Sequence, residues 1–193
     1  MKKAGKTICI YGASSQNCRK EYVDAAFSLG EEIARRGITL VSGGGRSGLM
    51  AAAIDGANSL GGTTIGILPR FMHERGWSHG ELSEMVLTET MHERKQEMVR
   101  LADAVIALPG GSGTLEELLE IITWRQLGLF SGQIVLLDTA GYYQPLIQVF
   151  DRAIADGFMK EQHRSIWRLA SSPVEAVDLA FSAPTTDLTP KVN

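Results

Sequence analysis

The stretch AVIALPGGSGTLEELLEIITWRQLG, residues 104–128, decides the fold. It begins with a short apolar run typical of a buried strand, passes through a glycine-rich turn, and ends in a segment with helical periodicity. The same order recurs along the chain, because short apolar runs alternate with helix-period segments. We predict strands at residues 7–12, 38–43, 63–69, 85–89, 104–110 and 133–139.

Continuous apolar strands separated by helices predict a parallel sheet that is covered on both faces and joined by right-handed crossovers. We therefore expect an α/β fold, built as a single Rossmann-like domain with a doubly wound, mostly parallel sheet. A short strand near 165–169 and a helix from Pro173 complete this domain, which we place at residues 1–182. Residues 183–193 are polar and contain two prolines, so we expect a disordered tail.

The composition excludes several classes of protein. A chain of 193 residues fits one domain, and its net charge of −3 gives no overall attraction to nucleic acid or to an anionic membrane. The cysteines, Cys9 and Cys18, and the four histidines lack the spacing of a metal site, and we expect neither a metal nor a cofactor. No membrane segment or signal peptide is recognisable, which predicts a cytoplasmic protein.

Three glycine-rich segments follow predicted strands, at residues 12–15, 42–48 and 109–114. In open α/β sheets ligands bind beyond the carboxyl ends of the strands, so these segments are expected to form one phosphate site. The second segment lacks the acidic residue of an NAD site, and no glycine loop here has the GK[ST] ending of a P-loop. Its candidate phosphate contacts are Gly43, Gly44 and Gly45, although a tight strand-to-helix turn would also need glycine.

Residues 109–117, PGGSGTLEE, fit the pattern PGGxGTxxE and resemble an anion cradle. The glycines let backbone amides approach an anion, and the following helix adds its positive end. Glu117 has two interpretations, because Thr114-x-x-Glu117 is also a capping box in which the carboxylate bonds the Thr114 amide. The candidate contacts in this loop are Gly110, Gly111, Ser112, Gly113 and Thr114.

Residues 90–102, TMHERKQEMVRLA, predict a helix with two cations on its apolar side. Arg94 and Lys95 fall within the arc that contains Met91 and Met98. Buried cations are costly unless they are paired, so a bound phosphate would explain both. Alternatively, the two side chains reach the surface or pair with carboxylates of the core.

Residues 70–84, RFMHERGWSHGELSE, lack clear periodicity and predict a functional loop or lid. We interpret Trp77, Trp124 and Trp167 as packing or interface residues rather than as platforms for stacking.

The segments MHERKQEM (91–98) and PGGSGTLEE (109–117), at this spacing, resemble the Lonely Guy (LOG) family of cytokinin riboside 5′-monophosphate phosphoribohydrolases. The resemblance extends from the GAS turn after the first strand, through SGGGRSGLM, to the helix that contains Thr123. It implies hydrolysis of the N-glycosidic bond of N6-substituted AMP, and in related members of AMP, to a free base and ribose 5-phosphate.

The resemblance also implies site residues and an assembly. Arg94 and Glu117 match the catalytic pair of the family, and a homodimer with the active site near the subunit interface is implied. The longer connection at 70–84 departs from some plant members, and it bears on whether an isoprenoid side chain or plain adenine is accepted. The remaining implied substrate contacts are Met91, Lys95, Leu115, Glu116 and Thr123.

The main alternative is a non-catalytic carrier, because similar folds in molybdenum cofactor carriers hold a phosphorylated ligand without breaking it. An inward Arg94 together with Glu117 favours the hydrolase, since holding a phosphate gains nothing from a nearby carboxylate. Lysine decarboxylation is disfavoured, because it needs a lysine-bound pyridoxal cofactor and Lys95 is the only lysine near the motifs.

Overall fold

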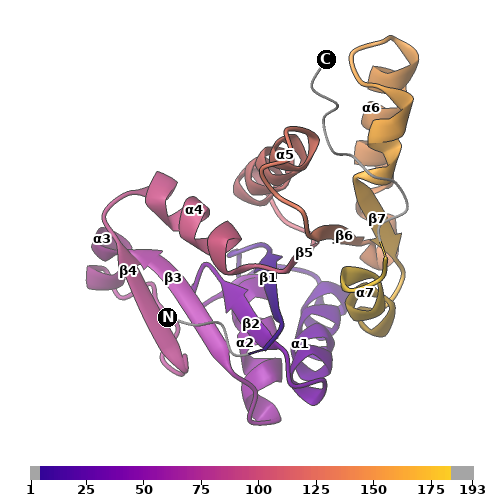
Figure 1. The fold of residues 1–193 in the computed structure, drawn as a ribbon. Helices are drawn as coiled ribbons and strands as arrows, with labels where there is room; N and C mark the ends of the chain where they lie inside the picture. Colours follow the sequence, from indigo (N-terminus) through magenta and orange to yellow (C-terminus); the bar gives the residue numbers. More distant parts are fainter. Residues whose placement is uncertain (1–4, 184–193) are drawn as a thin grey trace.

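The computed structural model describes residues 5–183, in which strands and helices alternate along the chain (Figure 1). The elements are β1 (Thr7–Tyr11), α1 (Lys20–Arg35), β2 (Thr39–Ser42), α2 (Gly48–Ser59), β3 (Thr64–Pro69), α3 (Arg70–Glu74), β4 (Glu84–Thr88), α4 (Met91–Leu101), β5 (Ala104–Ala107), α5 (Ser112–Gln126), β6 (Gln133–Leu137), η1 (Thr139–Gly141), α6 (Gln144–Ala155), η2 (Glu161–Ser165), β7 (Trp167–Ala170) and α7 (Pro173–Ala180).

Within the described residues, seven strands form one parallel sheet in the order β4-β3-β2-β1-β5-β6-β7. The central strand β1 places Ile8 opposite Leu40 of β2 on one side and opposite Ala104 of β5 on the other. The chain winds outward from β1 to β4, returns to the centre at β5, and winds outward again in the other direction. This reversal confirms the doubly wound α/β fold, and its switch point lies between β1 and β5.

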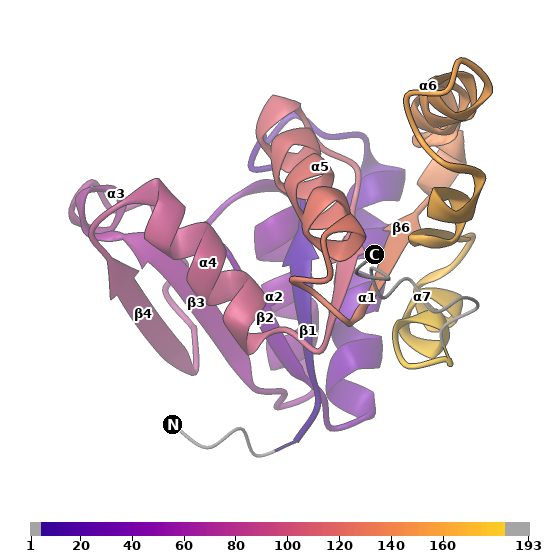
Figure 2. The same cartoon turned by 45° about the horizontal axis from the view of Figure 1, so that its top comes forward.

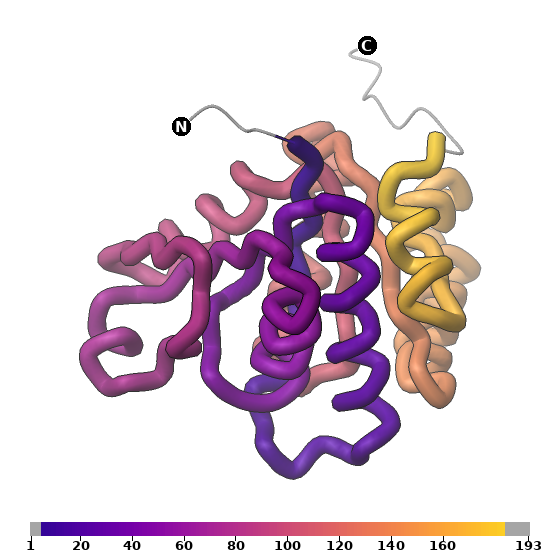
Figure 3. The backbone as a smooth tube through the Cα atoms, turned by 90° about the horizontal axis from the view of Figure 1, so that it is seen from below, coloured from indigo at the N-terminus to yellow at the C-terminus, as the bar shows by residue number. Residues whose placement is uncertain are grey.

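Helices cover both faces of the sheet (Figures 1 and 2). α1, α2 and α7 pack against the face to which Ile8 points, whereas α4, α5 and α6 pack against the face to which Cys9 points. Figure 3 shows α1 and α2 lying side by side on their face, in direct contact. Because neighbouring strand residues enter opposite cores, both sets must be apolar, which explains the continuous apolar runs in the sequence.

The predicted strands are present within a few residues of their expected bounds. The segment 70–84 differs from the expected loop, because its first five residues form α3. The predicted tail, residues 183–193, lies outside the described residues from 184 onward. Between residues 5 and 183, no helix is both long and apolar enough to span a bilayer.

Candidate active site

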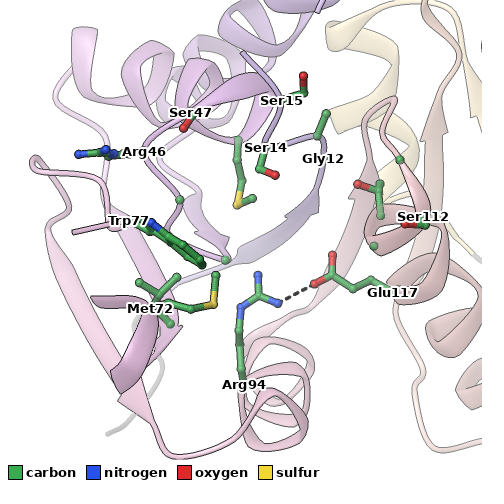
Figure 4. Close-up of a pocket in the computed structure, with 18 of the residues that line it drawn as sticks. Gly12, Ser14, Ser15, Arg46, Ser47, Met72, Trp77, Arg94, Ser112 and Glu117 are labelled. Carbon is green, nitrogen blue, oxygen red and sulfur yellow. Dashed lines mark hydrogen bonds and ion pairs between the residues drawn. The ribbon is translucent and has the colours of Figure 1, made fainter. Parts of the chain in front are cut away.

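A cavity of about 630 Å³ opens at the carboxyl ends of the strands, where the glycine-rich segments after β1, β2 and β5 meet (Figure 4). The structure thus brings the three predicted loops together at the switch point of the sheet. Of the sequence-predicted site residues, those that line the cavity are Gly43, Gly45, Met91, Arg94, Gly111, Ser112, Gly113, Thr114 and Glu117.

Arg94 lies one turn into α4 and is almost fully buried, with 7% of its side chain exposed. The helix begins just before it because the Thr90 hydroxyl accepts a hydrogen bond from the Glu93 amide at 3.1 Å, as an N-cap does. Two bonds fix the guanidinium. Nε donates to the carbonyl of Ile67 on β3 at 3.0 Å, and Nη1 donates to Oε1 of Glu117 at 2.8 Å.

The glycine segment after β2 leaves room for this guanidinium. A Cβ atom at Gly43 would lie 1.8 Å from Nη2 of Arg94, far inside van der Waals contact. Gly44 adopts a positive φ of 64°, and a Cβ atom there would lie 3.0 Å from the backbone of Gly66. Close packing therefore requires glycine at both positions, and Gly43 in particular lets Arg94 reach the cavity.

Glu117 extends from α5 toward Arg94 (Figure 4), and its side chain is 14% exposed. The capping-box interpretation of this residue is wrong. α5 begins at Ser112 with Gly111 as its N-cap, so Thr114 lies inside the helix and the Glu117 carboxylate bonds Arg94 instead. Burial raises the pKa of the Glu117 carboxyl above its ordinary value, although the Arg94 cation opposes this shift.

Residues 50–180 match a family model described as "Possible lysine decarboxylase". The chain is 42% identical over 173 residues to the probable cytokinin riboside 5′-monophosphate phosphoribohydrolase LOGL2 of Oryza sativa subsp. japonica, covering 90% of this chain and 71% of that protein. It is 41% identical over 177 residues to the cytokinin riboside 5′-monophosphate phosphoribohydrolase LOG5 of Arabidopsis thaliana, covering 92% and 78%. The chain belongs to the LOG family.

The fold is shared more widely. The molybdenum cofactor binding protein of Rippkaea orientalis has a TM-score of 0.70 and 26% identity, covering 91% of this chain and 95% of that chain. The resemblance to the LOG family rests on two sequence motifs, one on α4 and one that runs into α5. The two motifs contact each other through the ion pair of Arg94 and Glu117.

Lys95 lies next to Arg94 in sequence but outside the cavity lining. Its ammonium bonds Glu116 at 2.6 Å and Glu120 at 3.0 Å, both on α5. Burial disfavours the charge, yet the hydrogen bonds to these two glutamates and the attraction of their charges together outweigh burial and raise the pKa of Lys95. Arg94 and Lys95 therefore both pair with carboxylates in this structure, which is among the options that the sequence left open.

Several predicted contacts do not line the cavity. Leu115, Glu116 and Thr123 lie with Leu119 and Trp124 on a separate shallow surface of α5. Gly110 lies behind the loop, where its carbonyl accepts a hydrogen bond from the Tyr142 hydroxyl, and Gly44 is buried beneath its neighbours. Their roles in substrate binding stay predictions.

Sequence reasoning missed two residues of the segment 70–84, Met72 and Trp77, which line the cavity. Of the two expected roles, packing or interface, core packing is wrong for Trp77, because this residue is 42% exposed on the cavity wall, whereas Trp167 is buried. The sequence carries no local signal for this placement, since it depends on contacts between this segment and the glycine loop after β2.

Proposed function

We propose that this LOG-family protein hydrolyses the N-glycosidic bond of N6-substituted AMP, and of AMP more slowly, releasing the free base and ribose 5-phosphate. The observation that carries the proposal is the buried ion pair of Arg94 and Glu117, 2.8 Å apart, on the wall of a nucleotide-sized cavity. Relatives that are 41–44% identical and named cytokinin riboside 5′-monophosphate phosphoribohydrolases support it.

The 5′-phosphate is expected at the first turn of α5. The first amides of a helix have no partner within the helix, and the N-cap residue, Gly111, has no side chain to accept from them. An anion bound there would be stabilised by these amides and by the positive end of the helix. Ser112, Gly113 and Thr114 line the cavity at this turn and are the residues whose amides would contact the phosphate.

The chemistry follows from the position of Glu117. Cleavage of a glycosidic bond passes through a sugar cation, so a carboxylate beside C1′ stabilises that cation or accepts a proton from the attacking water. The hydroxyl of the water becomes the C1′ hydroxyl of ribose 5-phosphate, and the base departs with a proton. Arg94 orients the carboxylate through Nη1, and its Nη2, beside Gly43, is available to the leaving base or the phosphate.

The test is to incubate the purified protein, without added metal or cofactor, with AMP and with N6-isopentenyl-AMP, and to quantify free base and ribose 5-phosphate. We expect release, fastest from the substituted nucleotide. Glu117→Gln keeps the size of the side chain but loses its charge, and should lower kcat by about 10²- to 10⁴-fold. Glu97→Gln is the matched control, because Glu97 is a partly buried carboxylate paired with Arg100 away from the cavity.

Full activity of Glu117→Gln would refute the catalytic role of this carboxylate. Release from neither nucleotide, together with retention of a bound phosphorylated ligand, would replace the hydrolase with a carrier, in line with the fold shared with a molybdenum cofactor binding protein.

Lysine decarboxylation, the description of the matching family model, gains no support from this site. Within residues 5–183, the cavity lining contains no lysine that a pyridoxal aldehyde could reach. Lys95, the lysine nearest the motifs, is engaged by two glutamates outside the lining.

We also propose a homodimer whose interface lies beside the active site. α5 and the turn after it expose Leu119, Leu127 and Leu129, with relative exposures of 43%, 60% and 69%. Exposed apolar side chains on one region of a surface favour association. Thr123 lies on this side of α5, so a partner there would explain why a predicted substrate contact lies outside the cavity of its own subunit.

A cytoplasmic location is part of the same proposal. Cys9 and Cys18 are both free thiols in the described chain, as is usual in a reducing compartment.

A further inference from the structure

The wall segment, residues 70–79, is docked against the glycine loop after β2 rather than standing free as a lid. Two backbone hydrogen bonds hold it. The Arg46 amide donates to the Trp77 carbonyl at 3.0 Å and the His79 amide donates to the Gly44 carbonyl at 2.8 Å, and together they make an isolated antiparallel bridge between Ser78 and Gly45. The end of the wall segment is thus paired with the loop that also makes room for Arg94.

Side chains fix both flanks of this bridge. The imidazole of His79 is 10% exposed, and its Nε2 lies 3.0 Å from Oδ1 of Asp55 on α2. On the other flank, Nδ1 of His73 lies 3.0 Å from the hydroxyl of Ser78. The guanidinium of Arg75 lies 5.4 Å from the centroid of the Trp77 ring, which adds a cation–π contact. The Trp77 ring is therefore held in place on the cavity wall.

The wall segment makes one end of the cavity apolar. Figure 4 shows Trp77 and Met72 on the side opposite Ser112 and Glu117, with Arg94 between the two sides. Methionine adapts its shape to irregular apolar groups. The large apolar side chains of the cavity lining are those of Met50, Leu68, Met72, Trp77 and Met91.

The two ends suit the two ends of one ligand. A phosphate at the first turn of α5 and a sugar beside Glu117 leave the base to extend toward Arg94 and the wall segment. The groups that meet the far edge of the base are then an indole ring and thioethers, which favour an apolar substituent over the polar amino group of unsubstituted adenine.

We propose that Trp77, supported by Met72, determines which base this enzyme accepts. Trp77 contacts the N6 substituent and selects adenine nucleotides in which that substituent is apolar. This inference rests on the proposed hydrolysis and adds the residue that sets its substrate preference.

The kinetic test compares kcat/KM for N6-isopentenyl-AMP and for AMP in the wild type, Trp77→Ala and Trp77→Phe. Loss of an apolar contact in a binding pocket changes discrimination by about 10- to 200-fold. We expect Trp77→Ala to lower kcat/KM for the isopentenyl substrate by about 10- to 100-fold and that for AMP by less than about threefold. Trp77→Phe, which keeps an aromatic ring, should recover most of the preference.

Phe71→Ala is the matched control. Phe71 belongs to the same segment, is 43% exposed, and also contacts Arg75, at 5.6 Å, but it does not line the cavity. This substitution should leave kcat/KM unchanged for both substrates. An equal loss for both substrates in Trp77→Ala, or no loss for either, would overturn the inference.

Binding separates this inference from the proposed hydrolysis. Calorimetric titration of the Glu117→Gln protein with each nucleotide measures affinity without turnover. We expect tighter binding of N6-isopentenyl-AMP than of AMP, and loss of that difference when Trp77→Ala is added. Absence of base release in the wild type would refute only the proposed hydrolysis. If Trp77→Ala leaves the affinity for each nucleotide unchanged, only the role of Trp77 is refuted.

Discussion

Glu117 is subject to two opposing electrostatic effects. Burial disfavours its charged form and Arg94 favours it, and burial prevails, so the pKa of this carboxyl lies above its ordinary value. Its partner, Arg94, also donates a hydrogen bond to the carbonyl of Ile67 on β3, and this second bond fixes the position of the guanidinium. The surroundings of this carboxyl group, which must be ionised to act, therefore raise the pH at which it ionises.

The pH dependence of hydrolysis should report this balance. If the ionised carboxylate is the active form, kcat/KM is lost as the pH falls through the raised pKa of Glu117. The acid limb should then lie above the value of about 4.3 for an unperturbed glutamate. A profile of kcat/KM against pH at constant ionic strength checks this, and an acid limb at or below that value would contradict it.

Gly43 offers a second test at the same scale. A methyl group there would meet Nη2 of Arg94 at 1.8 Å, so Gly43→Ala must displace the guanidinium. We expect kcat/KM to fall by about 10²-fold, because small misplacements of catalytic groups have effects of this size. Gly80→Ala is the control, since a Cβ atom there meets nothing within 4 Å. If the two variants are equally active, catalysis does not require the observed position of the Arg94 guanidinium.

Sequence alone predicted part of this site. The inward position of Arg94 followed from helical periodicity, and the resemblance to the family implied that Arg94 and Glu117 are a catalytic pair, but the direct ion pair between them is known only from the structure. The function of Gly43 and the exposure of Trp77 could not be predicted, because each depends on an atom from another element whose distance no local pattern encodes.

At the scale of elements, the start of α4 controls where Arg94 stands. The Thr90 hydroxyl accepts from the Glu93 amide, and the Glu93 carboxylate accepts from the Glu89 amide at 3.0 Å. These bonds satisfy amides that the helix itself leaves unpaired. They fix the first turn, and Arg94 follows immediately after it.

Removal of this cap should cost measurable stability. Thr90→Ala is expected to lower the free energy of unfolding by about 1 kcal/mol, because an N-cap hydroxyl contributes about that much. Urea denaturation measures the change as a lower midpoint at unchanged slope. Thr90→Ser keeps the hydroxyl and should stay within a few tenths of a kcal/mol. Identical midpoints for the alanine and serine variants would argue against the cap.

The elements that sequence predicted well are those with long apolar patterns. The inner strands β1, β2, β3, β5 and β6 are almost wholly buried, so their continuous apolar runs were sufficient to find them, whereas the edge strands β4 and β7 are only partly buried. α3 was missed because five residues are too few to show a period. The start of α5 was misplaced because Thr114-x-x-Glu117 satisfies a local capping pattern, while the contact of Glu117 with Arg94 prevails in the fold.

At the scale of the whole molecule, the proposed dimer makes a direct prediction. Replacing Leu127 and Leu129 together by lysine places two charges on the exposed apolar surface beside α5. We expect sedimentation velocity to show a monomer for this variant and a dimer for the wild type, because a buried unpaired charge opposes association. Phe158→Lys is the control, since Phe158 is 84% exposed in the turn after α6.

If both the double lysine variant and Phe158→Lys dissociate, or if neither does, the result contradicts an interface beside α5. The doubly wound parallel sheet could be predicted from the alternation of strands and helices, but its strand order is known only from the structure. The surface of the proposed dimer could not be predicted either, since an exposed leucine has the same sequence signature as a buried one.

The position of β1 at the centre of the sheet has a consequence for how the protein is made. Its first residue, Thr7, bonds through its amide to the carboxylate of Asp103, 96 residues later, at the start of β5. At about 5–20 residues per second, a ribosome needs on the order of 5–20 s to add that stretch. During that interval one edge of β1 lacks its neighbour, and α4 and α5 cannot yet face each other. The nascent chain can therefore pair β1 with β5, and form the ion pair of Arg94 and Glu117, only in the second half of synthesis.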